Sequence, residues 1–389
     1  LSFYNFPYTF GMLFGLGHAR AILLSAVFIL IGMGIVMALS TCASPGRTGG
    51  PLDQPRFVRH LLWVGLAVAG MLVCSGIGAD WLHRNRRWLF GLSLLLLIAV
   101  LLPLGQYIPG VETERNGASR WIRWRSVGFQ PSELAKLATM LVAAAFLTRS
   151  ATAVKSFGRT LLPMLLLIAL VSGLILAEPD MGTAFLIAMT LGLMMVFAGV
   201  RLLYLAPFGV LGAGAIYWAI KIAPYRIARV KVFLDPEAHR WTREGYQVWQ
   251  SLISLGSGGL FGVGPGAGRQ KHGFLPEADT DFVFAIVGEE FGLIGTMLIL
   301  AVIVVAIWQG LRIAINARNA FSSVLAFGIT MLVGMQALIN IAVVTSSVPT
   351  KGIPLPFVSY GGSSMLMMAC AVGVLAGIAR EAEAARGSD

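Results

Sequence analysis

The sequence predicts an all-α polytopic membrane protein with about ten transmembrane helices. Of its 389 residues, 57% are hydrophobic and only 12% are charged, and the mean hydropathy is +0.79. A soluble domain of this length could not bury so many apolar side chains in one core. Because lipid offers the backbone no hydrogen-bond partners, every spanning segment is expected to be helical.

A helix that crosses a bilayer needs about 20 mainly apolar residues. In chain order, such runs are found at residues 21–39, 60–77, 89–104, 134–147, 161–177, 181–200, 203–222, 282–308, 324–344 and 363–378. The fourth run is short, and its polar start is expected to lie inside the bundle. We expect one transmembrane domain over residues 1–389, with a large extracytoplasmic loop at residues 221–281 between the seventh and eighth helices.

Lys and Arg residues in short loops orient the predicted spans. They follow the second, fourth, sixth, eighth and tenth spans, and all of these positions lie on one face. This face is expected to be cytoplasmic and to hold both termini, because the number of spans is even. The chain is therefore expected to be a multi-pass protein of a cytoplasmic membrane.

The net charge is +11, from 29 Lys and Arg residues against 18 Asp and Glu residues. Many of the cations fall in the longer loops of the opposite face, where they either attract anionic lipid headgroups or bind a polyanionic ligand. No nucleic-acid-binding module is recognisable, so nucleic acid is not expected as a partner. The cysteines lie far apart and the histidines lack ligand spacing, so neither a disulfide framework nor a zinc site is expected.

Two charged residues stand at the entry of the fourth span. Pro131 and Glu133 are ordinary residues for the first turn of a helix. Lys136, however, follows Glu133 by three residues and so shares its face of the helix. Because charges that enter a span normally face a bundle interior or a wet cavity, we expect Glu133 and Lys136 to form a buried ion pair.

Two loop motifs favour a local structural role. Glu178 and Asp180 lie in a tight turn between the fifth and sixth spans, where acids are usually solvated turn formers and less often touch a substrate. The glycine-rich segment 256–266 lacks a preceding strand and the GxxxxGK[ST] pattern, so nucleotide binding is not expected. Its glycines are expected to permit tight packing near a ligand.

Two further segments point to chemistry near the eighth and tenth spans. Glu277, Asp279 and Asp281 crowd the start of the eighth span, where burial and like charge favour a raised pKa and a proton acceptor. Residues 349–364 are too rich in Pro and Gly for a helix, yet too hydrophobic for a free loop. We expect a broken, re-entrant segment that lines a cavity.

Motifs in several of these segments resemble those of the SEDS family (shape, elongation, division and sporulation). In chain order they are FQPSE at 129–133, AEPDMGT at 177–183, GSGGL at 256–260, FLPE at 274–277 with TDF at 280–282, and PLP at 354–356 with SYGGS at 359–363. The stretch PTKG at 349–352 resembles the division branch, FtsW, more than the elongation branch, RodA.

The resemblance implies a peptidoglycan glycosyltransferase that polymerises lipid II, the undecaprenyl-pyrophosphate-linked disaccharide-pentapeptide. It implies that Asp281 is the catalytic carboxylate. Inverting transfer to a sugar hydroxyl needs one base on the hydroxyl and positive charge on the leaving group. Asp281 is therefore expected to act as general base on the acceptor GlcNAc 4-hydroxyl. The candidate substrate-binding residues are Arg120, Arg226, Arg229 and Lys351 for the pyrophosphate, with Glu133 and Lys136 shaping the central cavity.

No metal ligand cluster is evident, so no cofactor is required, although a divalent cation such as Mg²⁺ or Mn²⁺ is compatible with a pyrophosphate leaving group. Two alternatives remain open. Ionisable residues in spans and broken helices also suit a lipid II flippase, and a division scaffold without chemistry would need none of them. The placement of the carboxylate and most cations on one face favours an enzyme.

The resemblance also implies partners and a location. The chain lacks both Ser-x-x-Lys and Lys-Thr-Gly, the motifs of crosslinking enzymes. We therefore expect a class B penicillin-binding protein as its transpeptidase partner, together with membrane lipid and other division proteins, at the septum of a bacterial cytoplasmic membrane. Gly328, Gly334 and Ala337 on the ninth span are a candidate lipid-facing docking stripe.

Overall fold

The computed structural model describes residues 18–42, 54–102, 111–115, 118–124, 127–149 and 157–386, and the predicted helical membrane fold is confirmed. Each predicted span coincides with a helix. These helices are α2 (Ala19–Cys42), α3 (Pro55–Gly76), α4 (Ala79–Leu101), α5 (Pro131–Leu147), α6 (Leu162–Ala177), α7 (Met181–Phe197), α8 (Leu202–Ile222), α11 (Val283–Ile315), α12 (Ala320–Val344) and α13 (Gly362–Arg386).

Within the described residues, six of these helices are both long and apolar enough to cross a bilayer, namely α2, α3, α8, α11, α12 and α13. Helices α6 and α7 are apolar but shorter. Helix α4 carries several charged residues in its first half, and α5 begins with the polar residues that the sequence placed inside the bundle. The chain is a multi-pass membrane protein.

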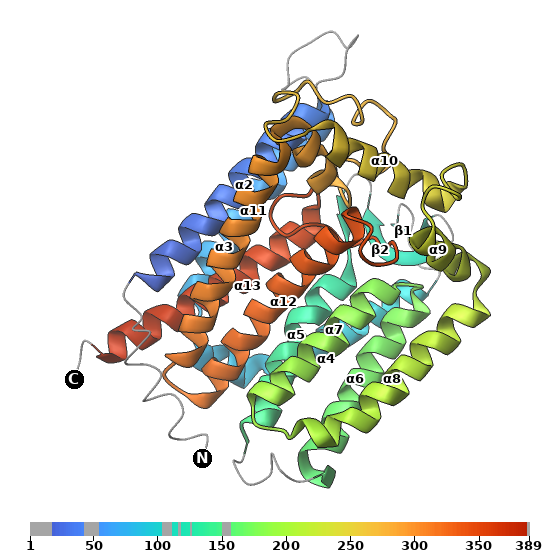
Figure 1. The fold of residues 1–389 in the computed structure, drawn as a ribbon. Coiled ribbons are helices and arrows are strands. Elements are labelled where there is room, and N and C mark those ends of the chain that lie inside the picture. Colours follow the sequence, from blue (N-terminus) through green and yellow to red (C-terminus); the bar gives the residue numbers. More distant parts are fainter. Residues whose placement is uncertain are drawn as a thin grey trace.

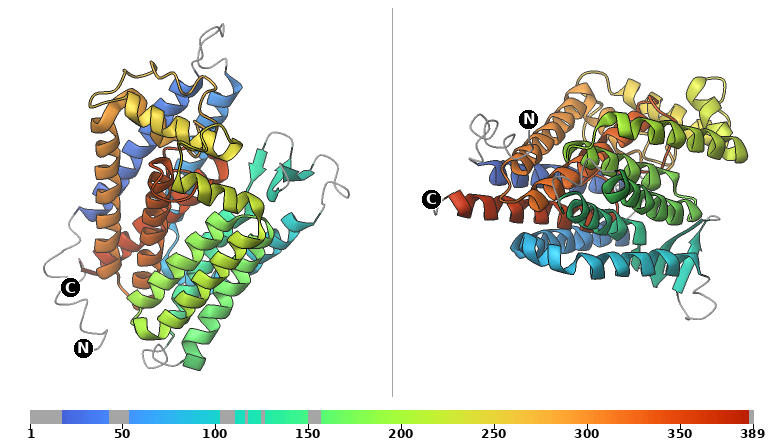
Figure 2. Two further views of the ribbon diagram at one scale, coloured as in Figure 1. Left: turned by 45° about the vertical axis from the view of Figure 1, so that its right-hand side comes forward. Right: turned by 90° about the horizontal axis from the view of Figure 1, so that it is seen from below.

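Helix α12 is the central element of the bundle. It packs against α5 and α7 on one side and against α11 and α13 on the other (Figure 1). Helix α13 runs along α3, and α2 runs along α11, which completes one half of the molecule, whereas α4 to α8 form the other half (Figure 2). Helix α8 has no buried side chain among its described residues, as expected for a helix in contact with lipid.

The expectation of a docking stripe on the ninth span is wrong. A Cβ atom at Gly328 would lie 2.6 Å from the Met194 sulfur of α7, and one at Gly334 would lie 3.0 Å from Ile307 of α11. Ala337 is also buried. These small residues let α12 approach its neighbours closely, so their role is in helix contacts inside the bundle.

A small antiparallel sheet, which the sequence did not predict, lies in the loop between α4 and α5. Its strands are β1 (Val111–Arg115), β2 (Ala118–Trp124) and β3 (Val127–Phe129), in the order β1-β2-β3. Figure 1 shows the sheet beside α9, at the end of the bundle where the long loop lies. Strand β2 carries Arg120 to this end.

The long loop contains two helices, α9 (Pro224–Leu234) and α10 (Arg243–Ser257), followed by an irregular glycine-rich stretch. This stretch fills a break in α11, where Gly292 has φ 66° and ψ −163°. The N–H of Val263 donates to the Glu289 carbonyl at 2.9 Å, and the N–H of Leu293 donates to the Gly259 carbonyl at 2.9 Å. The tight packing expected of these glycines is therefore confirmed, with the kink of α11 as its partner, whereas a ligand near them stays a prediction.

Two buried carboxylates on α11 hold the same loop. Glu290 forms an ion pair with Lys271 at 2.6 Å and accepts a hydrogen bond from Ser40 of α2 at 2.5 Å. Glu289 accepts from the backbone N–H of Arg269 at 2.7 Å. Neither acid was predicted to have a role, and their ion pair and hydrogen bonds show that they hold the loop against α11.

Candidate active site

Residues 345–361 join α12 to α13 without regular secondary structure and pack within the bundle, as predicted, although residues 362–364 already belong to α13. The side chains of Ile353, Leu355, Phe357 and Val358 are buried. Phe357 has φ 65°, a backbone conformation that a bulky residue adopts only where its surroundings impose it. The segment is therefore a fixed part of the bundle interior.

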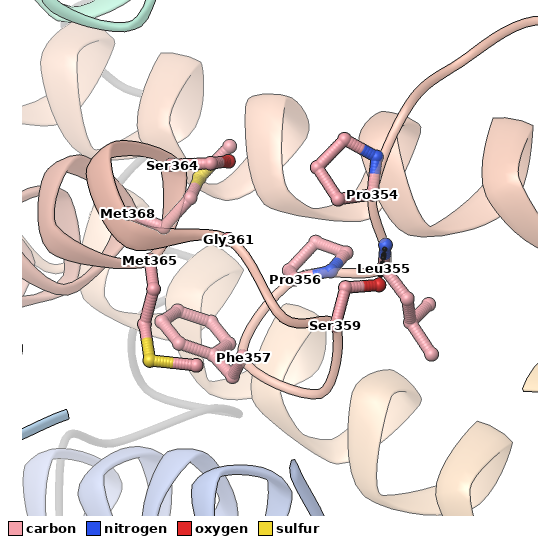
Figure 3. A pocket seen from close by; sticks show the side chains of 9 residues that line it. All are labelled: Pro354, Leu355, Pro356, Phe357, Ser359, Gly361, Ser364, Met365 and Met368. Carbon is pink, nitrogen blue, oxygen red and sulfur yellow. Dashed lines mark hydrogen bonds between the residues drawn. The ribbon is translucent and has the colours of Figure 1, made fainter. Parts of the chain in front are cut away.

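A small cavity separates this broken segment from the first turns of α13 (Figure 3). Its walls include Pro354, Ser359 and Met365, and its volume of about 10 Å³ accommodates at most a single water molecule. No sugar ring fits there. Figure 3 also shows the Ser359 hydroxyl close to the backbone of Leu355, whose N–H donates to it at 2.8 Å.

The three carboxylates before α11 have different surroundings. Glu277 accepts a hydrogen bond from the Thr280 hydroxyl at 2.8 Å, and Asp279 forms an ion pair of 3.4 Å with Arg56. The Asp281 carboxylate has neither a hydrogen bond nor an ion pair with any other described residue. Asp281 is therefore the member of the trio whose oxygens are free to meet a substrate.

The backbone of this trio is tied to two other elements. The carbonyl of Asp279 accepts the N–H of Tyr360 at 2.8 Å, and that of Thr280 accepts the Ser359 hydroxyl at 2.5 Å. The carbonyl of Asp281 accepts from Nδ2 of Asn340, on α12, at 2.7 Å. Three consecutive carbonyls are thus bound in place.

The pKa of Asp281 is raised to about 7, mainly by burial. The negative charges of Glu277, Asp180 and Asp279 contribute to this increase, whereas the positive charge of Arg120 opposes it. The raised pKa expected for this carboxylate cluster therefore belongs to Asp281. A carboxylate with a pKa near neutrality combines a populated basic form with a strong tendency to take a proton, as general base catalysis requires.

Three of the predicted cations converge near Asp281. Arg120 donates through Nε to the Glu178 carbonyl at 3.0 Å and through Nη2 to the Pro179 carbonyl, which fixes it against the turn between α6 and α7. Arg229, on α9, donates to the Thr350 carbonyl at 3.2 Å and interacts electrostatically with the carboxylate of Asp281. The arrangement places two guanidinium groups within electrostatic range of the carboxylate.

Lys351 is the third cation of this cluster. Its ammonium nitrogen lies 4.7 Å from the centre of the Phe185 ring. Burial lowers the pKa of Lys351, with a smaller decrease from Arg229, whereas Asp180 opposes the change. A Cβ atom at the next residue, Gly352, would lie 2.9 Å from Oδ2 of Asp281, so this part of the broken segment passes directly against the carboxylate.

Arg226 points to other partners. Its guanidinium donates to the Ala219 carbonyl of α8 at 2.8 Å and to the Tyr225 hydroxyl at 2.9 Å. The Tyr225 ring also lies under the guanidinium of Arg229, with 5.7 Å between the centres. Arg226 thus holds Tyr225, which in turn packs against Arg229. The structure does not bring Arg226 itself to Asp281.

Glu133 and Lys136 form the predicted buried ion pair, with 2.8 Å between Oε2 and Nζ and side-chain exposures of 4% and 3%. Lys136 also donates to Oε1 of Gln336, on α12, at 2.9 Å, and Gln336 donates to the Pro354 carbonyl at 3.0 Å. The ion pair is therefore connected to the broken segment, which agrees with a role in shaping the central cavity.

Both acids of the turn between α6 and α7 are buried, so the expectation of solvated acids is wrong. Asp180 caps α7 by accepting the N–H of Thr183 at 3.1 Å. Glu178 is fully buried, and its carboxyl oxygens have no hydrogen-bond partner among the described residues. The pKa of Glu178 is raised to about 8, mainly by burial and in part by the charge of Asp180, whereas Arg120 opposes both. The side chain is consequently a neutral acid at pH 7.

We expect Glu178→Gln to flatten the pH dependence of stability. In the unfolded chain the carboxyl ionises near its ordinary pKa of 4.5, whereas in the folded protein it stays protonated until about pH 8. The wild type therefore loses stability as the pH rises through this window, and the isosteric amide removes that loss. Thermal unfolding of both proteins from pH 5 to pH 8 measures the difference.

Glu237→Gln is the matched control for this experiment, because Glu237 is exposed on the long loop. It should follow the wild-type curve at each pH. If the curves of Glu178→Gln and the wild type also run parallel, Glu178 does not carry the buried proton.

The described residues contain no group of three or more His, Cys, Asp or Glu side chains arranged to hold a metal ion. Asp180 interacts electrostatically with both Asp281 and Glu178, but its carboxylate is engaged in capping a helix. We therefore derive no catalytic step through a divalent cation.

Asn340 was not among the residues predicted for the site. A signal was present, since Gln336 and Asn340 are polar residues four positions apart in an otherwise apolar span and so share one helix face. The structure shows that this face meets the broken segment. Their partners, Pro354 and Ile353, lie too far away in the sequence to be paired with them by pattern alone.

Comparison with known proteins gives consistent matches over almost the whole chain. The family model FTSW_RODA_SPOVE, described as cell cycle protein, matches residues 20–384. A protein from Coxiella burnetii, named probable peptidoglycan glycosyltransferase FtsW, is 40% identical over 358 residues, which cover 91% of this chain and 94% of that protein. Stage V sporulation protein E from Bacillus subtilis is 38% identical, with coverage of 92% and 96%.

Solved structures share the fold. A structure described as showing structural coordination of polymerization and crosslinking by a peptidoglycan synthase complex aligns with a TM-score of 0.75 at 24% identity, over 92% of this chain and 97% of that chain. The crystal structure of the rod shape determining protein RodA from Thermus thermophilus aligns with a TM-score of 0.65 at 24% identity, over 92% and 96%.

Proposed function

The chain belongs to the FtsW, RodA and SpoVE family of cell cycle proteins, and from this premise we propose how its site performs peptidoglycan synthesis. It is a peptidoglycan glycosyltransferase, most similar to FtsW, the member that acts in cell division. The substrate is lipid II, and the product is a glycan strand still linked to undecaprenyl pyrophosphate.

Asp281 is the general base of the reaction. Its carboxylate takes the proton of the acceptor GlcNAc 4-hydroxyl while the hydroxyl oxygen attacks the anomeric carbon of the donor. The bond from that carbon to the pyrophosphate breaks on the opposite face, so the configuration inverts and the pyrophosphate leaves with the electron pair. The observation that carries this proposal is the unpaired, partly buried carboxylate of Asp281 within a cluster of cations.

Arg120, Arg229 and Lys351 stabilise the leaving pyrophosphate. Each is at least partly withdrawn from solvent, so its positive charge acts on developing negative charge more strongly than in water. Backbone carbonyls hold the two guanidinium groups, and an aromatic ring lies under Lys351. Because these groups are positioned before the substrate arrives, little reorganisation opposes the reaction.

The active site faces the extracytoplasmic side of a bacterial cytoplasmic membrane at the division septum, with both termini in the cytoplasm. A class B penicillin-binding protein crosslinks the strands that this chain makes, and other division proteins position the pair. The absence of the two transpeptidase motifs from the sequence supports this division of labour.

The decisive experiment mixes purified protein with lipid II, in the presence and absence of a cognate class B penicillin-binding protein, and resolves the glycan strands on a gel. Polymer formation by the chain alone or in the complex supports the proposal. A flippase would instead move labelled lipid II across a vesicle bilayer without polymer, and a scaffold would do neither.

The pH dependence of polymerisation provides a second test. The rate should rise with pH through about 7, since Asp281 must lose its proton to act as base. Glu277→Gln removes the largest charge contribution to this pKa, so the rising limb should move to lower pH. If the rising limb of the pH–rate profile lies at the same pH in Glu277→Gln as in the wild type, another group controls the rate.

A further inference from the structure

Asn340 connects two segments that approach the reaction centre from different parts of the chain. It lies on α12, is buried, and uses both hydrogens of its carboxamide. One goes to the carbonyl of Asp281 and the other to the carbonyl of Ile353, each at 2.7 Å. Since both partners can only accept, the carboxamide orientation follows from them.

The two segments meet beside the carboxylate. Gly352 precedes Ile353 and lies directly against Oδ2 of Asp281. Lys351, one residue earlier, carries one of the cations. The bridge through Asn340 therefore fixes the distance between the carboxylate and the backbone that presents this cation. Gln336, one turn away on the same helix face, holds the next carbonyl of the segment, that of Pro354.

We propose that Asn340 is a positioning residue for Asp281, which ties the carboxylate-bearing segment to the broken segment so that base and cations keep a single geometry. Ser359 and Tyr360 complete the arrangement by holding the two preceding carbonyls. The inference rests on the proposed role of Asp281 as general base. A displacement of about 1 Å at such a group can cost on the order of 10²-fold in rate.

The test is Asn340→Leu, which has a similar volume but no donor. We expect the kcat for lipid II polymerisation to fall on the order of 10²-fold while KM is unchanged, because the substrate contacts remain and the base is misplaced. Release of Gly352 from the carboxylate also admits water. Since burial is the main cause of the raised pKa of Asp281, the rising limb of the pH–rate profile should move to lower pH.

Ser251→Ala is the matched control. The Ser251 hydroxyl is buried and donates to the carbonyl of Val344, also on α12, at 2.8 Å. Its loss removes a comparable hydrogen bond from the same helix without touching residues 279–281. We expect this control to lose about as much thermal stability as Asn340→Leu. Its kcat and the rising limb of its pH–rate profile should match those of the wild type.

Ser359→Ala keeps the proposal testable if Asn340→Leu does not fold. It releases the Thr280 carbonyl and should lower kcat in the same way, with a smaller effect because Asn340 still holds Asp281. The positioning role is refuted if Asn340→Leu polymerises lipid II with the same kcat as Ser251→Ala and with the rising limb of its pH–rate profile at the same pH. The same criterion applies to Ser359→Ala if it is used in place of Asn340→Leu. If the wild type makes no polymer, either alone or with the class B penicillin-binding protein, the proposed function has failed, and this inference fails with it.

Discussion

Asp281→Asn should leave the protein inserted and folded but remove polymerisation of lipid II. Asn has nearly the same shape as Asp and lacks only the ability to accept the proton, and loss of a general base typically lowers the rate about 10²- to 10⁴-fold. Stability should not suffer, because burial already disfavours the charged form of this side chain. Strand synthesis by the purified variant, compared with its thermal unfolding curve, measures both expectations.

Two matched substitutions make the result specific. Asp235→Asn changes an exposed carboxylate in the same long loop, whose oxygen accepts the N–H of Ala238, and it should polymerise at the wild-type rate. Asp279→Asn breaks the ion pair with Arg56 but leaves the base in place. If Asp279→Asn loses all activity while Asp281→Asn retains it, the base has been assigned to the wrong carboxylate.

The sequence was sufficient to predict the helices of the fold, because hydrocarbon imposes a simple rule on length and composition. It also predicted the Glu133–Lys136 ion pair, whose members are three residues apart on one helix. In both cases the relevant physical chemistry is local. Patterns of this kind can be recognised in the sequence without knowing which helices pack against each other.

Failures occurred where the answer depended on packing between distant segments. Glycines spaced along α12 are equally compatible with a lipid-facing stripe and with a contact between helices. Only the three-dimensional neighbours Met194 and Ile307 show that these glycines lie in helix contacts. Glu178 lies in a sequence typical of a solvated turn, yet the fold buries it. Its environment comes from segments far away along the chain.

The candidate site shows the same division. The motif around Asp281 predicted the catalytic carboxylate, and charge alone made Arg120, Arg229 and Lys351 candidates for the pyrophosphate. Charge could not separate Arg226 from them, because its partners are a carbonyl on α8 and the neighbouring tyrosine.

The Glu133–Lys136 pair should respond to mutation in a non-additive way. Lys136→Met leaves the Glu133 carboxylate buried without its cation, and an uncompensated buried charge costs about 3–5 kcal/mol. Glu133→Leu should cost less, because Lys136 keeps the carbonyl oxygen of the Gln336 side chain as a partner. The double variant Glu133→Leu/Lys136→Met removes both charges and should be close to the wild type in stability. Thermal unfolding of the four proteins in one detergent gives the coupling free energy.

An exposed pair with the same spacing isolates the contribution of burial. Glu237 and Arg240 are also three residues apart and lie 3.3 Å from each other, but their side chains are 72% and 37% exposed. Solvent screens such a pair, so its members should contribute no more than about 1 kcal/mol and their removal should be additive. Additive losses at Glu133 and Lys136 as well would mean that the buried pair does not exist in the membrane. A large coupling there and none at the surface would show that burial makes the two charges interdependent.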